Sequence, residues 1–444
     1  MKKVLYGTTA LVAAGFVAGE AQAAGGLKLG ITGFYRNSIG AQFGNGVVNQ
    51  LGGFVFPTVN GVAASNSFTA GYGRFNHQAV SMRQEIRVNF TGKTTLDNGI
   101  TVGVLVGLNG ENVAKAGSTT QINRAYADFS GKFGMVRIGE ANSALLTECV
   151  VDPGNVTSNF GVNSPNESFS NVGKSIIQSP LGKLKNTAFG PSGPMASIGT
   201  CYGLEGKGNK LMYFSPSFGG FTFGVSFTPQ GSSRIAGGNL NFPSDGTNFN
   251  GQTSPISNIV SVGADYQHDF GSWNLLVGGG AEYAPTQYTH FGSTNSSDRP
   301  GMYQGGFQVG FGPFAVGASG AYYQNYHNDG FNAQGVTPGD DAWVVTGGGS
   351  YTIDAWSFGL QGMYSSWQYG GNVDKEKSYA VSLNSAYALG PGISLEGQVA
   401  WTAADYGDNF GIFTTPPIVN GVRTAGLNGY VHAVEIDFGT AINF

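Results

Sequence analysis

The chain carries little charge and lacks long apolar runs. Asp, Glu, Lys and Arg together make up 11% of its 444 residues. Beyond the N-terminal segment there is no run of about 18 apolar residues, which is roughly the length that a transmembrane helix needs. The formal net charge is −4, so no basic excess favours nucleic-acid binding. The composition therefore excludes a helical membrane protein and predicts no nucleic-acid partner.

Motifs for enzymatic chemistry are also missing. The five His residues are scattered along the chain, and no Gly-x-Ser-x-Gly elbow or metal-ligand spacing occurs. The carboxylates do not form an Asp-x-Asp-x-Asp calcium loop either. We therefore predict that the protein is not an enzyme and that it needs no metal ion or cofactor.

The N-terminal segment has the features of an export signal. Lys2 and Lys3 supply a positive start, an apolar stretch follows, and Ala21-Gln22-Ala23 is a small-residue cleavage site. We predict that residues 1–23 form a cleaved signal peptide and that residues 24–444 form the mature protein as a single transmembrane domain.

Cysteine is rare, and Cys149 and Cys201 are the two that the chain contains. The export signal places both in an oxidising compartment, where a disulfide between them is possible. Their spacing is also compatible with two separate thiols in a long loop. The sequence leaves both alternatives open.

Glycine, aromatic residues and alternation are abundant. Gly contributes 74 residues, and aromatic residues make up 13% of the chain. In the last segment, residues that tolerate or prefer lipid occupy every second position up to Phe444, whereas Glu435 and Asp437 have the opposite parity. This period of two is that of a β-strand with unlike faces. An apolar outer face and a polar inner face suit a membrane barrel.

Similar segments recur through the mature chain, joined alternately by short turns and by long polar loops. The first is expected from Leu27 to Ile39, and a clear hairpin has the turn Asp97-Asn98-Gly99. The total is about sixteen strands, and the sheet must close because lipid cannot hydrogen-bond an open edge. The predicted fold is all-β, a 16-stranded antiparallel transmembrane β-barrel with aromatic residues near both sets of connections.

A barrel of about sixteen strands is wide enough to enclose an aqueous channel. The loop from about Asn142 to Gly208 is much longer than ordinary connections, and we predict that this third external loop folds into the lumen and narrows it. The predicted pore-lining side chains come from the first five strands and from this loop: Arg36, Arg83, Glu85, Arg87, Arg124, Arg137, Glu148, Asp152 and Glu167.

These charged side chains have two possible roles. Opposed charges across a constriction would create a transverse field that orients dipolar solutes. The arginines could instead be structural partners of inward acids such as Glu85 and Asp128. Both roles can hold together.

Four features of the sequence point to a known family: the leader ending Ala21-Gln22-Ala23, the segment from Arg124 to Gly139, the long loop directly after it, and the terminal Phe444. With these features the whole chain resembles a general porin of the Gram-negative outer membrane, of the alphaproteobacterial type. The resemblance implies an outer-membrane homotrimer that allows passive diffusion of small hydrophilic solutes and ions.

The resemblance also implies roles for individual residues. In such porins the third external loop forms an eyelet, which would place Arg83, Arg87, Arg124 and Arg137 on the wall opposite Glu148 and Asp152. It implies a sorting role for Phe444 in barrel assembly. The expected partners are therefore outer-membrane lipid, lipopolysaccharide and the barrel-assembly machinery.

Two other functions stay open. A substrate-selective channel for sugars or anions would use inward aromatic side chains such as Phe34, Tyr126 and Tyr323. A non-transport surface or adhesive barrel would use the Asn- and Gly-rich outer loops, such as residues 45–66. Single-channel conductance would separate them: block of the current by a micromolar solute would favour the selective channel, and the absence of current would favour the adhesive barrel.

Overall fold

The computed structural model of the chain describes residues 26–51, 72–110, 122–150, 153–162, 200, 203, 208–230, 256–287, 301–324, 341–368, 375–410, 418–419, 422–423 and 426–444. This part of the chain is nearly all β-strand, with one short helix, α1 (Ala144–Thr147). The described residues contain no helix that is long and apolar enough to cross a membrane.

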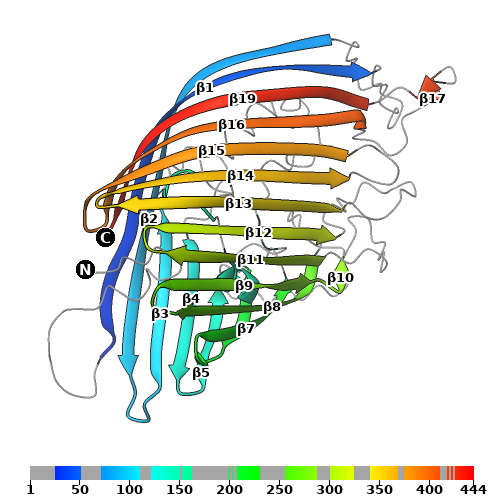
Figure 1. Ribbon diagram of the computed structural model, residues 1–444. Helices are drawn as coiled ribbons and strands as arrows, with labels where there is room; N and C mark the ends of the chain where they lie inside the picture. The colour runs from blue at the N-terminus through cyan, green and yellow to red at the C-terminus, as the bar shows by residue number, and fades with distance from the viewer. Residues whose placement is uncertain are drawn as a thin grey trace.

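The strands follow one another with short connections at one end and long connections at the other (Figure 1). The first nine are β1 (Lys28–Leu51), β2 (Tyr72–Thr95), β3 (Thr101–Asn109), β4 (Ile122–Gly131), β5 (Gly134–Glu140), β6 (Asn209–Phe214), β7 (Phe221–Gln230), β8 (Ile256–Asp269) and β9 (Trp273–Tyr283). The remaining strands are β10 (Thr286–Gln287), β11 (Gly301–Phe311), β12 (Phe314–Gln324), β13 (Ala342–Ile353), β14 (Trp356–Gln368), β15 (Lys375–Gly390), β16 (Ile393–Phe410), β17 (Ile418–Val419), β18 (Val422–Arg423) and β19 (Gly426–Asn443).

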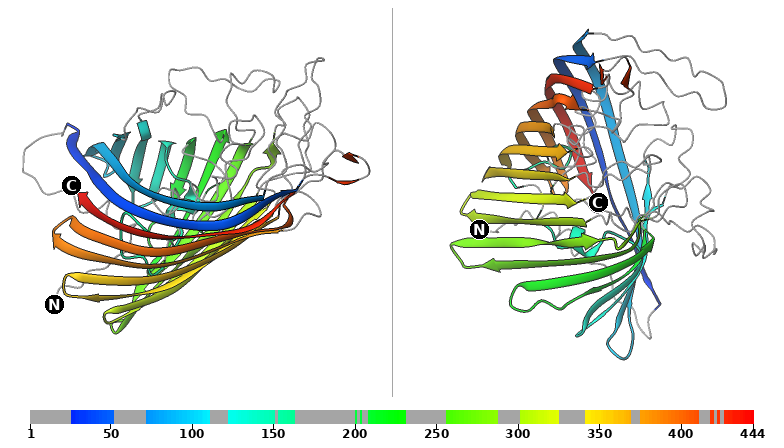
Figure 2. Two further views of the ribbon diagram at one scale, coloured as in Figure 1. Left: turned by 90° about the horizontal axis from the view of Figure 1, so that it is seen from above. Right: turned by 90° about the vertical axis from the view of Figure 1, so that its right-hand side faces the viewer.

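The sheet is antiparallel and closes on itself. Successive strands pair along the chain, and β1 pairs with both β2 and β19, so the first and last strands meet. The two-residue β10 prolongs the edge of β9 and pairs with β8, and β17 and β18 form a separate small hairpin. The barrel therefore has 16 strands, as the sequence predicts. Figure 2 shows from two further directions how the strands curve into a continuous wall.

The last residue completes this closure. The Gly33 N–H donates to the Phe444 carbonyl oxygen at 2.7 Å, and the Phe444 N–H donates to the Gly33 carbonyl oxygen at 3.0 Å. These two bonds satisfy backbone groups that an open sheet edge would expose to lipid. The C-terminus is thus part of the β1–β19 seam.

The two faces of the wall have opposite character. On β19 the outward Phe438 is 64% exposed, whereas the inward Glu435 and Asp437 are 4% and 1% exposed. On β1 the outward Leu29 is 82% exposed. A soluble sandwich would bury such aliphatic and aromatic side chains, whereas an outer-membrane barrel presents them to lipid. The alternation predicted for the last strand is confirmed.

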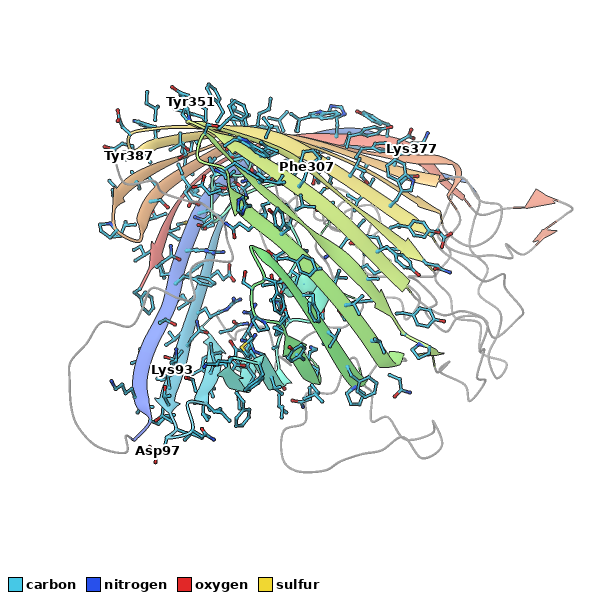
Figure 3. The ribbon with its side chains drawn as sticks, turned by 60° about the horizontal axis from the view of Figure 1, so that its bottom comes forward. Lys93, Asp97, Phe307, Tyr351, Lys377 and Tyr387 are labelled. Atoms are coloured by element: carbon cyan, nitrogen blue, oxygen red, sulfur yellow. The ribbon has the colours of Figure 1, made fainter. Side chains whose placement is uncertain are left out.

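Aromatic side chains gather near both ends of the wall. Phe314 packs between Phe311 and Tyr351 beside the short turns, with ring centroids 5.7 and 4.8 Å away. Near the long connections, the rings of Trp343 and Tyr364 lie 5.0 Å apart. In Figure 3, Tyr351 and Tyr387 lie at one end of the wall and Lys377 lies at the other. Two such bands suit the two membrane interfaces.

The first strand is longer than the side-chain pattern predicts. The alternation predicts an end near Ile39, but β1 continues to Leu51, which lies in register with Gly426 of β19. This outer part of β1 pairs with β2 as well. Backbone pairing does not require alternating side chains, so the sequence pattern marks the membrane-facing part of a strand and underestimates its full length.

Candidate functional site

The third external loop joins β5 to β6 and lies against the inside of the barrel. It begins after Glu140 with a single helical turn, α1, whose first residues Ala144 and Leu145 are fully buried. Ser143 caps this turn by accepting a hydrogen bond from the Leu146 N–H at 3.4 Å. The buried turn shows that the chain leaves β5 toward the lumen.

Serine side chains of the wall hold the first part of the loop. The Ala144 N–H donates to Ser226 Oγ of β7 at 3.1 Å, and the Leu145 N–H donates to Ser261 Oγ of β8 at 2.9 Å. The Ser143 hydroxyl donates to the fully buried Glu282 of β9. The first N–H groups of a helical turn have no acceptor inside the helix, and here side chains of the barrel wall supply acceptors for two of them.

The loop then forms a compact turn between Asn155 and Phe160. The Asn155 side chain accepts from the Thr157 N–H at 2.9 Å and donates to the Phe160 carbonyl oxygen at 2.7 Å. The Phe160 side chain is fully buried. We call residues 155–160 the tip turn. Its internal hydrogen bonds fix its shape.

Inward side chains of β14, β15 and β16 bind the backbone of the tip turn and of the two residues that follow it. Glu396 accepts from the N–H groups of Ser158 and Asn159 at 2.9 and 2.8 Å, and from Asn159 Nδ2 at 2.9 Å. Asn384 accepts from the Val156 N–H at 3.0 Å. Two further acceptors continue the row beyond the tip turn, with Gln398 bound to the Gly161 N–H at 3.1 Å and Gln361 bound to the Val162 N–H at 3.3 Å.

Inward glycines of the wall allow the loop backbone to approach closely. A β-carbon at Gly263 would lie 2.6 Å from the Ala144 carbonyl oxygen, and one at Gly278 would lie 2.4 Å from that of Glu148. Where the loop reaches β13 and β14, β-carbons at Gly348 and Gly359 would lie 2.4 and 2.1 Å from the carbonyl oxygens of Pro153 and Gly154. These inward glycines, which we call the glycine track, let the loop backbone run close along the inner face of the wall.

The returning part of the loop, which leads back to β6, is also attached to the barrel. Thr200 and Ser319 of β12 share a hydrogen bond of 2.7 Å, and Ser319 shares another of 2.7 Å with Thr346 of β13. In the outgoing part of the loop, which follows β5, the buried Cys149 is disulfide-bonded. Cys201, the other cysteine of the chain, lies outside the described residues.

The structure places four predicted arginines on the inner wall of β1 to β5. Arg36 and Arg87 share one carboxylate, with nitrogen–oxygen distances of 3.8 and 3.5 Å to the buried Glu85. Their guanidinium groups lie 4.2 and 4.9 Å from the Phe34 ring centroid. The side chain of Arg83 lies outside the described side chains.

The other two arginines have different partners. Arg137 holds Asp128 through two hydrogen bonds of 2.6 and 2.9 Å and lies 4.0 Å above the Tyr126 ring. Arg124 donates to the neutral side chain of Asn142 at 3.4 Å, at the start of the loop. The structural pairing considered for the arginines is thus present at Glu85 and Asp128, whereas Arg124 binds an amide.

Glu148, directly after α1, lies against β7 and β8 of the barrel wall. Its carboxyl group lies beside Asp265 of β8, and the Thr222 hydroxyl of β7 donates to both acids. Burial, together with the hydrogen bond and charge of Asp265, raises the pKa of Glu148 to about 8. At neutral pH this loop acid is mostly uncharged. Asp152 and Glu167 lie outside the described residues.

The wall residues that hold the loop were missed in the sequence, and parity was the available signal. Gln361, Asn384, Glu396 and Gln398 all occupy inward positions of strands, where the alternation places polar side chains. A buried polar row on the inside of a wide barrel needs partners. The sequence does not say that a loop 199 to 238 residues earlier supplies them.

Among the described residues, the three inward aromatic side chains considered for sugars, Phe34, Tyr126 and Tyr323, do not form an open ladder. Tyr323 is fully buried, and guanidinium groups lie over Phe34 and Tyr126. No group of His, Cys, Asp and Glu side chains within the described residues is arranged to hold a metal ion. The arrangement supports a charged, polar constriction around water.

The comparisons with known proteins agree with this architecture. The family model described as Gram-negative porin matches residues 7–407. The fold is similar to that of the outer membrane channel DcaP of Acinetobacter baumannii, with 12% identity, a TM-score of 0.55, and coverage of 96% of this chain and 100% of that chain. It is also similar to the outer-membrane expressed OmpT of Vibrio cholerae, with 10% identity, a TM-score of 0.50, and coverage of 96% and 100%.

These two structures, at such low identity, support the fold alone. Among curated proteins no sequence matches the chain. The family match spans most of the chain, including β1 to β15 and the entire third external loop. The chain therefore belongs to the Gram-negative porin family, and it is an outer-membrane channel for passive diffusion.

Proposed function

We propose that the channel is narrowest where residues 141–162 of the third external loop lie on the inner wall, and that small hydrophilic solutes and ions diffuse past this loop. The observation that carries the proposal is the attachment of the loop to one strand after another, from Ser226 on β7 to Glu396 on β16. A loop held in this way occupies part of the lumen permanently. The mature barrel would comprise residues 24–444, with the constriction loop at about 142–208.

Charged side chains of two sectors would line this constriction. The basic sector comes from β1 to β5, and the acids come from the loop and the remaining wall. We assign pore-lining roles to Arg36, Arg83, Glu85, Arg87, Arg124, Arg137, Glu148, Asp152 and Glu167. Inward acids outside β1 to β5 include Asp265, Glu282, Glu396, Glu435 and Asp437. This separation supports a transverse field that acts on dipolar solutes.

The inward acids of the described strands support a weak preference for cations at neutral pH. Replacing Arg83 and Arg87 with Ala should strengthen this preference, because two positive charges leave the lumen. An unchanged reversal potential in a salt gradient would contradict their placement in the pore. We propose no enzymatic activity and no cofactor, since the sequence contains no catalytic motif and the described residues contain no group that could hold a metal ion.

Export, assembly and covalent structure complete the proposal. Residues 1–23 would act as a cleaved signal peptide, and the mature chain would form a homotrimer in contact with outer-membrane lipid and lipopolysaccharide. Phe444 would be read by the barrel-assembly machinery. Cys149 would pair with Cys201, which would fasten the outgoing part of the loop to its returning part.

Single-channel recording in planar bilayers tests the proposed function. We expect stable, ohmic current steps with weak cation selectivity at neutral pH. Block of the current by micromolar sugar or anion would favour a substrate-selective channel instead. A correctly folded protein that gives no current would favour a surface or adhesive role.

A further inference from the structure

Glu435 and Asp437 form a pair of buried carboxyl groups on the lumen side of β19. They occupy successive inward positions of the strand and are almost fully buried. The two carboxyl groups lie within hydrogen-bonding reach of each other. No donor of the described residues reaches Glu435 Oε1 or Asp437 Oδ1, although both atoms are buried. The pair, which we call the β19 acid pair, therefore has two acceptor oxygens that lack a donor.

Both of these oxygens face the same position of the neighbouring strand. β19 lies between β1 and β16 (Figure 1), and Gly40 of β1 is in register with Asp437. A β-carbon at Gly40 would collide with Asp437 Oδ1 and would lie 3.6 Å from Glu435 Oε1. Glycine at this position thus leaves the space in which the two carboxyl groups meet.

No positive charge compensates the β19 acid pair within the described side chains. None of the salt bridges found there includes Glu435 or Asp437. The nearest titratable residues on the same face of the wall are Arg36 of β1, His77, Arg83 and Glu85 of β2, and Glu396 of β16. Arg36 is bound to Glu85 at 3.8 Å, and Glu396 holds the tip turn. The side chains of His77 and Arg83 lie outside the described side chains.

Gln398 of β16 links the β19 acid pair to the third external loop. Its Nε2 donates to Asp437 Oδ2 at 3.4 Å, and its Oε1 accepts from the Gly161 N–H at 3.1 Å. The next inward residue of β19 is Gly439, where a β-carbon would lie 3.2 Å from Phe160 Cζ. The pair thus lies one inward position from the tip turn, and a single side chain connects it to the loop backbone.

The chemistry of the β19 acid pair favours a bound proton. Two adjacent buried carboxylates repel each other and lose hydration, so both are not ionised without a compensating charge. A carboxylate has no donor, and a hydrogen bond between two carboxyl groups therefore requires a proton on one of them. A calcium ion would need about six to eight oxygen ligands. The described residues contain no group of three or more acidic, His or Cys side chains that could hold a metal ion.

We propose that Glu435 and Asp437 hold one proton between them, and that this proton keeps the tip turn on the wall. Release of the proton to water breaks one O–H bond and leaves two carboxylates, which repel each other. Asp437 then moves away from Glu435 and loses its hydrogen bond to Gln398, so the loop loosens as the pH rises. The inference rests on the proposed function, because a loosened loop alters the current only if it narrows the channel.

Infrared spectroscopy of the folded, full-length protein at neutral pH tests the proton directly. The reference protein is Glu148→Gln, because burial raises the pKa of Glu148 to about 8 and this acid would contribute a band of its own. Adding Glu435→Gln should remove the carbonyl stretch of one protonated carboxyl group. Adding Asp97→Asn, at the exposed turn between β2 and β3, should leave the band unchanged. A band that survives Glu435→Gln would overturn the inference.

Single-channel recording tests the link to the loop. In the Glu148→Gln reference, conductance and current noise should rise as the pH increases from about 5 to about 9, between the ordinary pKa values of carboxyl groups and of tyrosine. Adding Asp437→Asn should abolish this rise, because the amide can accept from Gln398 and donate to Glu435 without a proton that leaves. Adding Asp97→Asn should preserve it.

Three results would count against the β19 acid pair or the proposed function. A rise with pH that persists in Asp437→Asn would overturn the inference. If that variant does not form heat-modifiable barrels, Glu435→Gln replaces it, and a persistent rise there has the same meaning. Increased noise on adding a chelator of divalent cations at neutral pH would assign the pair to a metal ion and overturn the inference. Absence of any current in the wild type would overturn the proposed function, while the infrared band still decides on the proton.

Discussion

Asn159 of the third external loop and Glu396 of β16 are separated by 237 residues in the sequence and are joined by two hydrogen bonds, of 2.8 and 2.9 Å, to the same carboxylate oxygen. The other oxygen of Glu396 accepts from the Ser158 N–H and from Ser394 Oγ. One buried side chain of the wall thus fixes the tip turn. The shape of the pore depends on side chains that contact the loop as well as on those that contact solutes.

Replacing Glu396 with Ala should release the tip turn from the wall. Two loop N–H groups would lose their acceptor, at a cost of roughly 1–3 kcal/mol each where they stay buried. We expect larger and noisier single-channel currents and a lower unfolding temperature. Ser394→Ala is the matched control on the same strand, since it removes a hydroxyl that donates to Glu396 and makes no hydrogen bond to the described residues of the loop. Currents of wild-type size and noise in Glu396→Ala would show that the remaining contacts are enough to hold the tip turn against the wall.

Replacing Gly359 with Ala should displace the loop. Its β-carbon would lie 2.1 Å from the Gly154 carbonyl oxygen, so the loop backbone must move toward the lumen, and such overpacking costs about 1–3 kcal/mol. We expect a change in conductance. Gly362→Ala on the outward face of the same strand is the control, because the nearest atom to its β-carbon is 4.0 Å away. If both variants behave alike, the glycine track does not position the loop.

Raising the pH should affect the channel through Glu148. Its pKa of about 8 in the folded protein lies above its ordinary value of 4.5, so the folded state keeps a proton that the unfolded state loses. Stability should therefore fall as the pH rises from about 4.5 through 8. Above pH 8 the ionised Glu148 faces Asp265, and cation selectivity should increase. Thermal unfolding and reversal potentials across this range measure both effects.

Glu148→Gln is the control for this prediction. It keeps a group of the same shape beside Asp265 and Thr222 but cannot ionise. Its stability and selectivity should vary less with pH than those of the wild type. Identical pH profiles in both proteins would assign the dependence to other groups.

Replacing Phe444 with Ala should impair assembly of the barrel in cells and leave the stability of the folded barrel nearly unchanged. The backbone of residue 444 makes both hydrogen bonds to Gly33, and these remain in the variant, whereas the side chain is 56% exposed. We expect less assembled protein in the outer membrane of cells and nearly normal refolding into detergent. Equal losses in both measurements would indicate a structural role for the ring instead.

The fold was predictable because lipid and water impose opposite chemistry on the two faces of each strand. The outward Phe438 and the inward Asp437 follow this rule, and so do the inward Arg36 and Arg124. The true end of β1 was not predictable, because the segment up to Leu51 is held by backbone pairing, which leaves no side-chain pattern.

The candidate site was predictable as a region but not in its contacts. The length of the loop after β5 indicated a constriction, since ordinary connections are far shorter. The position of Glu148 beside Asp265, rather than beside an arginine, depends on how α1 seats on Ser226 and Ser261. Such long-range contacts leave no periodic signal in the sequence.

The size limit for permeating solutes tests the central claim most directly. It can be measured with graded neutral polymers, comparing the wild-type protein with a variant that lacks residues 153–162, both shown to form heat-modifiable barrels. The account predicts that the variant admits larger polymers and has a higher conductance, because the attached loop no longer occupies the lumen. The same size limit and the same conductance in both proteins would contradict the placement of the constriction.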